Sequence, residues 1–328
     1  MANAEQLKAL VKSHAEGDDT RFYSVALQVA ARAARSGQAH FAQDLRDLVD
    51  QLRQAEPHQE RRGAGPVPVA KPRGDLAGLL SVSYPTTRMS DLVLAPQVSA
   101  QLQRVVLEQR QHDRLHAEGF RPLRRVLLIG PPGTGKTLSA AALAGELRLP
   151  LFVIRLDGLI TKFMGETAAK LRLIFDALAE TRGVYLFDEV DALGGERGRE
   201  NDVGEIRRVL NSFLQFLEGD QSESLLVAAT NHPQLLDRAM FRRFDAVIEY
   251  PLPSGAVARE VIRNRLATVR LGRISWRGVD AAATGLSHAE ITLAAERAAK
   301  DAILAGDESV GSARLISALR ERHSRTGA

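Results

Sequence analysis

The sequence of 328 residues contains no cysteine. This absence excludes disulfide bonds, thiolate zinc sites, iron–sulfur clusters and cysteine nucleophiles. The chain also lacks long apolar runs: segments such as Val126–Ile129 and Leu225–Ala229 fall far below the roughly 20 residues that cross a bilayer. Residues 1–10 carry Glu5 and Lys8 and contain no apolar core of a secretion signal. A soluble, cytoplasmic protein without a membrane partner is therefore expected.

A large excess of one charge is also missing. The 44 basic and 40 acidic residues leave a net charge of +4, which is too small to indicate a chain that binds nucleic acid or a membrane over its whole surface. Apolar residues make up 45% and charged residues 26% of the sequence. Both values are typical of a globular protein and argue against a mostly disordered one.

Two segments precede the main part of the chain. Residues 1–56 carry apolar residues at helical spacing, among them Phe22, Val25 and Val29, which predicts short helices. Residues 57–75 contain four prolines and three glycines, a composition typical of a linker. We expect a small all-helical domain over residues 1–56 that binds a partner or adaptor, followed by this linker.

From residue 76 onward, short apolar runs alternate with helical patterns. This alternation favours a parallel sheet covered by helices. The predicted strands are Arg125–Ile129, Leu151–Leu156, Val184–Phe187, Leu225–Ala229 and Ala246–Tyr250. Beyond Pro251 and Pro253 only helical patterns remain, and Ser287 with Glu290 forms a capping box that begins one of these helices.

The strongest motif is Gly130-Pro-Pro-Gly-Thr-Gly-Lys136-Thr137, which lies directly after a predicted strand and before a predicted helix. Its glycines allow successive backbone N–H groups to surround a phosphate at the helix N-terminus. Lys136 is expected to reach the β- and γ-phosphates, and the Thr137 hydroxyl to bind Mg²⁺. The predicted contacts to ATP in this segment are Pro132, Gly133, Thr134, Gly135, Lys136, Thr137 and Leu138.

Two acids follow the apolar strand Val184–Phe187. A strand that is buried on both faces has no structural use for acids at its carboxyl end, whereas a metal–nucleotide site has. We expect Asp188 to hold Mg²⁺, usually through water, and Glu189 to orient and deprotonate the attacking water. Their place some fifty residues after the glycine-rich loop strengthens this interpretation.

Polar and basic residues follow two further predicted strands or turns. Asn231 comes directly after Leu225–Thr230 and either positions the same water or simply begins the turn before Pro233. Arg242 and Arg243 are adjacent, shortly before the last predicted strand. They are either surface charge or, as in ring-forming nucleotide hydrolases, arginine fingers that neutralise charge on a neighbouring subunit's γ-phosphate.

Together these segments resemble the AAA family of ATPases, in the branch that carries a second region of homology. The resemblance covers about residues 76–328 and implies an α/β P-loop NTPase fold, a three-layer sandwich with a parallel five-stranded sheet. It implies a large ATPase subdomain over residues 76–251 and a small helical lid over residues 252–328. It also implies ATP and Mg²⁺ as cofactors and a homo-oligomer, specifically a hexamer.

The resemblance also assigns residues outside the glycine-rich loop. Asp91 and Val93 occupy the place where the family's backbone meets adenine, and Ala289 lies in the lid segment that contacts the adenosine. Many members separate their two arginines, whereas Arg242 and Arg243 are adjacent, as in the microtubule-severing and membrane-complex-disassembly relatives. Either of the two can therefore be the finger.

A further segment, Lys162-Phe163-Met164, resembles the family's substrate-gripping pore loop. The alternative interpretation of Phe163 is a buried aromatic of the core, but its polar neighbours in sequence favour an exposed position in the pore. The leading hypothesis is an ATP-driven protein remodeller or unfoldase, serving a separate effector or subtilisin-like protease. The alternatives are a nucleotide-dependent assembly switch that threads nothing and, less favoured, a DNA-acting loader.

Overall fold

The computed structural model describes residues 76–159, 164–193, 203–236 and 238–326. Contacts divide the chain into two units, Met1–Val69 and Ala70–Ala328. The first unit lies outside the described residues, and so does the predicted linker over residues 57–75. The helical domain expected over residues 1–56 therefore stays a prediction.

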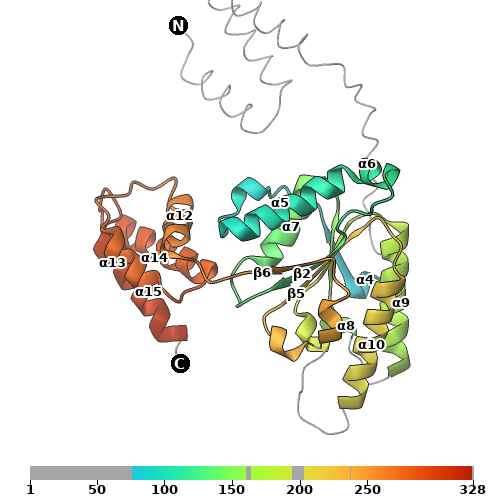
Figure 1. Ribbon diagram of the computed structural model, residues 1–328. Coiled ribbons are helices and arrows are strands. Elements are labelled where there is room, and N and C mark those ends of the chain that lie inside the picture. Colours follow the sequence, from blue (N-terminus) through green and yellow to red (C-terminus); the bar gives the residue numbers. More distant parts are fainter. Residues whose placement is uncertain (1–75, 160–163, 194–202, 237, 327–328) are drawn as a thin grey trace, which may run out of the picture. The chain divides into compact units, whose positions relative to one another are not determined.

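The described part of the second unit is built on a six-stranded mixed sheet with the order β1-β3-β4-β5-β2-β6 (Figure 1). The strands are β1 Leu80–Ser83, β2 Arg125–Ile129, β3 Leu151–Ile154, β4 Val184–Phe187, β5 Leu225–Thr230 and β6 Ala246–Glu249. The five predicted strands are present and pair in parallel. The expectation of only five strands is corrected, because β1 adds an antiparallel edge strand to β3.

Helices cover both faces of this sheet. Successive residues of a strand point to opposite faces: Leu127 and Phe187 pack with helices α9 (Met164–Glu180) and α10 (Val203–Gly219). Val126, Leu128 and Leu186 pack with α5 (Pro96–Arg110) and α7 (Lys136–Leu147) on the other face (Figure 1). Because both faces are covered, β4 and β5 are buried along their whole length, as expected for central parallel strands.

Short helical segments connect these elements. They are α4 Leu76–Leu79, α6 His112–Ala117, α8 Leu156–Leu159, α11 Arg238–Phe241 and the 3₁₀ turns Met89–Asp91, Val190–Leu193 and Pro233–Leu235. No helix in the described ranges is both long and apolar enough to cross a membrane.

After β6 the described chain is helical, with a hydrophobic core of its own. Its helices are α12 Gly255–Arg265, α13 Trp276–Ala283, α14 His288–Leu304 and α15 Ser312–Thr326. The predicted capping box at the start of α14 is present: the Ser287 N–H donates to Glu290 Oε2 at 2.8 Å, and Ser287 Oγ accepts from the Glu290 N–H at 3.4 Å. The boundary between residues 251 and 252 itself stays a prediction.

Candidate active site

The loop between β2 and α7 has a backbone that only glycines adopt easily. Gly130, Gly133 and Gly135 have φ of 147°, 73° and 101°, in the region that side chains disfavour. A Cβ at Gly130 would lie 2.3 Å from the Tyr250 carbonyl oxygen, so the loop needs glycine there for space as well. This geometry, followed at once by the N-terminus of α7, suits a cradle of N–H groups for an anion.

Lys136, the first residue of α7, lies over this loop. Its Nζ donates to the carbonyl oxygens of Gly130 at 2.7 Å and Pro131 at 2.8 Å, and the residue is only 6% exposed. Burial lowers the pKa of its ammonium, while the Asp188 and Asp191 carboxylates oppose that shift. A buried cation held by neutral carbonyls would gain from an anionic ligand such as a phosphate.

Thr137 and Asp188 meet although they are far apart in the sequence. The Thr137 hydroxyl donates to Asp188 Oδ2 at 2.7 Å, because α7 begins at the carboxyl end of β2 and Asp188 follows β4 at the same edge of the sheet. A hydroxyl and a carboxylate are the hard oxygen donors that Mg²⁺ prefers, and Mg²⁺ takes its remaining ligands from water and phosphates. The donor set therefore fits the expected magnesium ion.

Glu189 has a backbone conformation that is rare for a residue with a side chain. Its φ is 55°, its N–H donates to Asp188 Oδ1 at 3.1 Å, and its side chain is exposed. Backbone strain of this kind concentrates at functional sites. The exposed carboxylate beside Asp188 is accessible to a water molecule, as a general base must be.

The turn that carries Asn231 is fixed by a hydrogen-bond network that the sequence did not predict. The buried Thr230 hydroxyl donates to Asp191 Oδ1 at 2.7 Å and accepts from the His232 N–H at 2.9 Å. Since Phe187 of β4 pairs with Ala228 of β5, Asn231 follows the strand next to Asp188 at the same sheet edge. The network thus holds Asn231 in a defined turn beside the two acids.

A cavity of about 350 Å³ adjoins the loop, a size typical of small-molecule sites. Among the residues predicted from the sequence, Asp91, Val93, Thr134, Gly135 and Leu138 line it. Residues from α12 and α14 that the sequence did not single out also line it: Val261, Asn264, Arg265, His288 and Thr292.

The predicted residues Pro132, Gly133 and Ala289 lie around this cavity rather than in its wall. Pro132 is exposed in the loop. The Ala289 N–H donates to the Gly133 carbonyl oxygen at 3.0 Å. A Cβ at Gly133 would lie 2.7 Å from Ser287 Oγ. The start of α14 is therefore packed directly on the glycine-rich loop.

The two arginines lie at the opposite edge of the sheet from the glycine-rich loop, where the amino ends of the parallel strands meet. Arg242 and Arg243 occupy the turn that leads to the amino end of β6, and Asp245 in this turn accepts from the Arg125 N–H at 2.9 Å. The loop Gly130–Gly135, by contrast, follows the carboxyl end of β2, about 13 Å along the strand from Arg125. The arginines therefore do not join the site of their own chain.

The two arginines also differ in their surroundings. Arg243 Nε lies 2.6 Å from Glu218 Oε1 of α10, and its side chain is 27% exposed. Arg242 is exposed. Arg243 therefore forms an ion pair within its own chain, whereas Arg242 faces solvent. The pore residues Lys162 and Phe163 lie outside the described residues, and Met164 is described only as the first residue of α9.

Comparisons with known proteins agree with this geometry. Residues 126–252 match the family described as ATPase family associated with various cellular activities (AAA). The AAA family ATPase y4kL of Sinorhizobium fredii is 33% identical over 304 residues, 93% of this chain and 90% of that protein. The ATP-dependent zinc metalloprotease FtsH of Methylibium petroleiphilum is 35% identical over 260 residues, 73% of this chain but only 42% of the protease.

A solved structure has the same fold. The FIGL-1 AAA domain superposes with a TM-score of 0.59 at 26% sequence identity, covering 74% of this chain and 85% of that domain. The matched segment contains the glycine-rich loop, both acids, Asn231 and the two arginines. The near full-length likeness to y4kL and this common fold establish that the chain belongs to the AAA family of ATPases.

Proposed function

We propose that the protein is a Mg²⁺-dependent ATPase that remodels other proteins as a homo-oligomeric ring. The ring is proposed to be a hexamer, as the resemblance to the AAA family implies. One observation carries this proposal: Arg242 and the glycine-rich loop lie at opposite edges of one sheet. A chain that needs both can bring them together only by packing the arginine edge of one subunit against the loop edge of the next.

Different residues of the chain are proposed to bind phosphate, to bind the metal and to accept the proton. Lys136 and the loop N–H groups would neutralise phosphate charge, and Thr137 with Asp188 would hold the metal. When bound, ATP would supply the phosphoanhydride bond that is hydrolysed, and Mg²⁺ would withdraw charge from its phosphate oxygens. A carboxylate oxygen of Glu189 accepts a proton from the attacking water, whose position Asn231 fixes. Arg242, from the neighbouring subunit, neutralises charge on the terminal phosphate, with Arg243 supporting it from its ion pair with Glu218.

Adenine is proposed to occupy the cavity beside the loop. Asp91 and Val93 line one side and α14 the other. Because Thr134 and Gly135 of the loop and residues of α14 both line the cavity, a nucleotide in it would touch both the loop and the helical portion. ATP binding and hydrolysis can therefore move the helices relative to the sheet.

We propose that a protein is the substrate and that Phe163, with Lys162 and Met164, lines the pore that grips it. The near balance of 44 basic and 40 acidic residues favours a protein over nucleic acid as the substrate.

Residues 1–56 are proposed to select the partner or adaptor, and a separate subtilisin-like protease is one candidate. The cytoplasm is the proposed location. An assembly switch that threads nothing is the alternative.

Stimulation of ATP hydrolysis by an unfolded polypeptide tests the threading proposal. The probe is reduced, carboxymethylated lactalbumin, which cannot refold. We expect it to raise the hydrolysis rate of the full chain, and Phe163→Ala to bring the ratio of rates with and without the probe to about one. Phe120→Ala is the matched control, since Phe120 is 66% exposed and far from the pore segment in sequence. An unchanged ratio in Phe163→Ala, or no stimulation of the unmodified chain, contradicts threading.

A further inference from the structure

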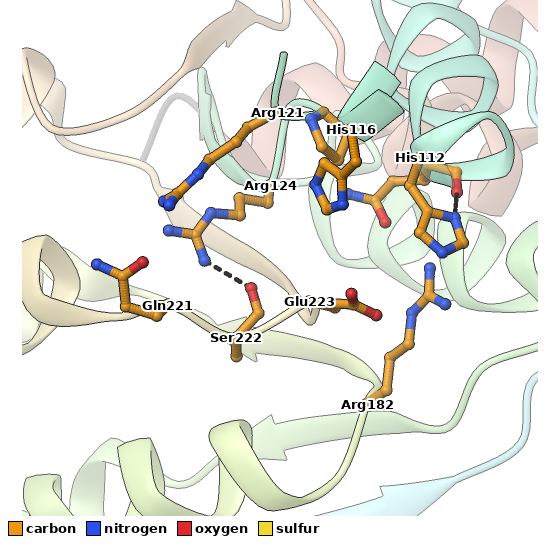
Figure 2. Close-up of a pocket in the computed structure, with 10 residues that line it drawn as sticks. His112, His116, Arg121, Arg124, Arg182, Gln221, Ser222 and Glu223 are labelled. Carbon is orange, nitrogen blue, oxygen red and sulfur yellow. Dashed lines mark hydrogen bonds between the residues drawn. The ribbon is translucent and has the colours of Figure 1, made fainter. Parts of the chain in front are cut away.

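A second cavity lies at the edge of the sheet opposite the glycine-rich loop. It measures about 130 Å³, and Figure 2 shows the residues that line it. Its position follows from the strand directions: Arg124 directly precedes β2, Arg182 shortly precedes β4, and Glu223 shortly precedes β5. All three strands are parallel, so the residues before them gather at one edge. His112 and His116 of α6 also line the cavity.

The wall of this cavity is rich in cations. Arg121, Arg124 and Arg182 line it, and Glu223 is its only carboxylate among the described lining residues. Asp220, behind the wall, is already paired with Arg124: the two side chains lie 3.1 Å apart and are 4% and 9% exposed. Positive charge therefore remains in excess inside the cavity.

The neighbouring groups do not remove this excess. Asp113, which is not part of the wall, lies 3.2 Å from His112 Nε2, and His112 Nδ1 lies 3.1 Å from the Gln109 carbonyl oxygen. Arg125 is paired with Asp245. Within the described part of the chain, neither Arg121 nor Arg182 forms an ion pair.

Arg182 has a buried donor that lacks an acceptor, and Arg121 and Arg124 place two like charges near each other. Arg182 Nε is fully buried and has no hydrogen-bond partner among the described residues, which is an unfavourable state for a charged donor. Arg121 and Arg124 approach the cavity together (Figure 2). Burial lowers the pKa of Arg124, Asp220 opposes this, and the like charges of Arg125 and Arg121 add to the lowering. A negative charge between these groups would relieve both conditions.

We propose that this cavity binds a phosphate-type oxyanion, at a site separate from the nucleotide. Guanidinium groups offer paired N–H donors whose geometry matches phosphate oxygens. At about 130 Å³ the cavity is smaller than the roughly 300–1,000 Å³ of a typical small-molecule site, so its size suits a phosphate group rather than a nucleotide. The ligand is either free inorganic phosphate or a phosphoryl group on a small carrier.

Calorimetric titration of the full chain tests this site. The protein is first saturated with a non-hydrolysable ATP analogue and Mg²⁺, so that the glycine-rich loop is filled, and is then titrated with inorganic phosphate or, separately, with phosphoserine. We expect one further site per chain. Binding of phosphate alone assigns the free anion, and tighter binding of phosphoserine assigns a phosphoryl group on a carrier.

Two variants connect the binding to this cavity. Arg182→Gln and Arg121→Gln are each expected to weaken binding at least about tenfold, because each removes a charged donor. Arg121 is exposed, so its replacement keeps the test valid should Arg182→Gln fail to fold. Arg114→Gln is the matched control, an exposed arginine of α6 outside the cavity wall. The proposal is overturned if neither ligand binds the filled protein, or if Arg114→Gln weakens binding as much as the other two.

Discussion

His288 lines the cavity beside the glycine-rich loop and differs from an ordinary solvated histidine. Both ring nitrogens are buried and have no hydrogen-bond partner among the described residues. Burial lowers the pKa of its imidazole, because a charged ring would lose its hydration there. The folded chain therefore favours neutral His288, in a position where a nucleotide base or ribose can supply the missing partner.

This burial predicts a pH dependence of stability. An imidazole in the unfolded chain titrates near pH 6.5, whereas the pKa of folded His288 is lower. The stabilisation from neutral His288 is thus complete above about pH 6.5 and is lost as the pH falls toward the folded pKa. We expect the melting temperature of the nucleotide-free chain to exceed that of His288→Gln by a margin that shrinks between pH 7.5 and pH 5. A margin that stays constant over this range contradicts the prediction.

At the residue scale, the sequence predicts what depends on local spacing. Lys136 and Thr137 are recognisable because the glycines, the preceding strand and the following helix are contiguous in sequence. The hydrogen bond between Thr230 and Asp191 is not recognisable, since it joins positions 39 residues apart and both residue types are common after strands. His288 is likewise missed, because its burial arises only when α14 packs on the loop.

At the scale of elements, a buried ion pair joins the end of α10 to the start of β2. Arg124 contacts Asp220 through its side chain at 3.1 Å and also donates to the carbonyl oxygens of Asp220 and Ser222 at 2.6 Å each. The side chains of Arg124 and Asp220 are 9% and 4% exposed. Removing one member of such a pair leaves an uncompensated buried charge.

We therefore expect Asp220→Ala to lower the free energy of unfolding by about 3–5 kcal/mol. Asp220→Asn, which keeps a hydrogen-bond acceptor for Arg124, should lower it less. The control is Glu321→Ala, which breaks the more exposed pair between α14 and α15, Arg297 with Glu321 at 2.6 Å, and should cost less than about 1 kcal/mol. Urea unfolding followed by circular dichroism measures all three. Similar losses for Asp220→Ala and Glu321→Ala would show that burial does not decide the cost.

The elements themselves show which strands a sequence can predict. The five parallel strands carry enough apolar residues to be recognised, and their predicted bounds agree with the structure to within two residues. β1 was missed because only Leu80 of its four residues is fully buried and its partner β3 lies some seventy positions later. An antiparallel edge strand of this kind is specified by pairing rather than by its own pattern.

At the scale of the whole molecule, the residues around the glycine-rich loop and the two arginines lie at opposite edges of the sheet. Lys136, Glu189 and Asn231 follow the carboxyl ends of β2, β4 and β5, whereas Arg242 precedes the amino end of β6. Each chain therefore holds one loop edge and one arginine edge. Subunits packed head to tail would complete one site at every interface, and such packing closes into a ring when the rotation allows it.

Mixing two inactive variants tests whether neighbouring subunits share the site. We expect Glu189→Gln to slow ATP hydrolysis by about 10²–10⁴-fold through loss of the general base, and Arg242→Ala by about 10³–10⁵-fold through loss of the finger. In an equimolar mixture, an Arg242→Ala subunit with intact Glu189 meets the intact Arg242 of a Glu189→Gln neighbour, so steady-state hydrolysis should recover well above either variant alone. The double variant is the control, since mixing it with either single variant restores no complete interface. Repeating the mixture with Arg243→Ala decides which arginine crosses the interface. A failure of both mixtures to recover would mean that each chain carries a complete site by itself, and the ring would have to be abandoned.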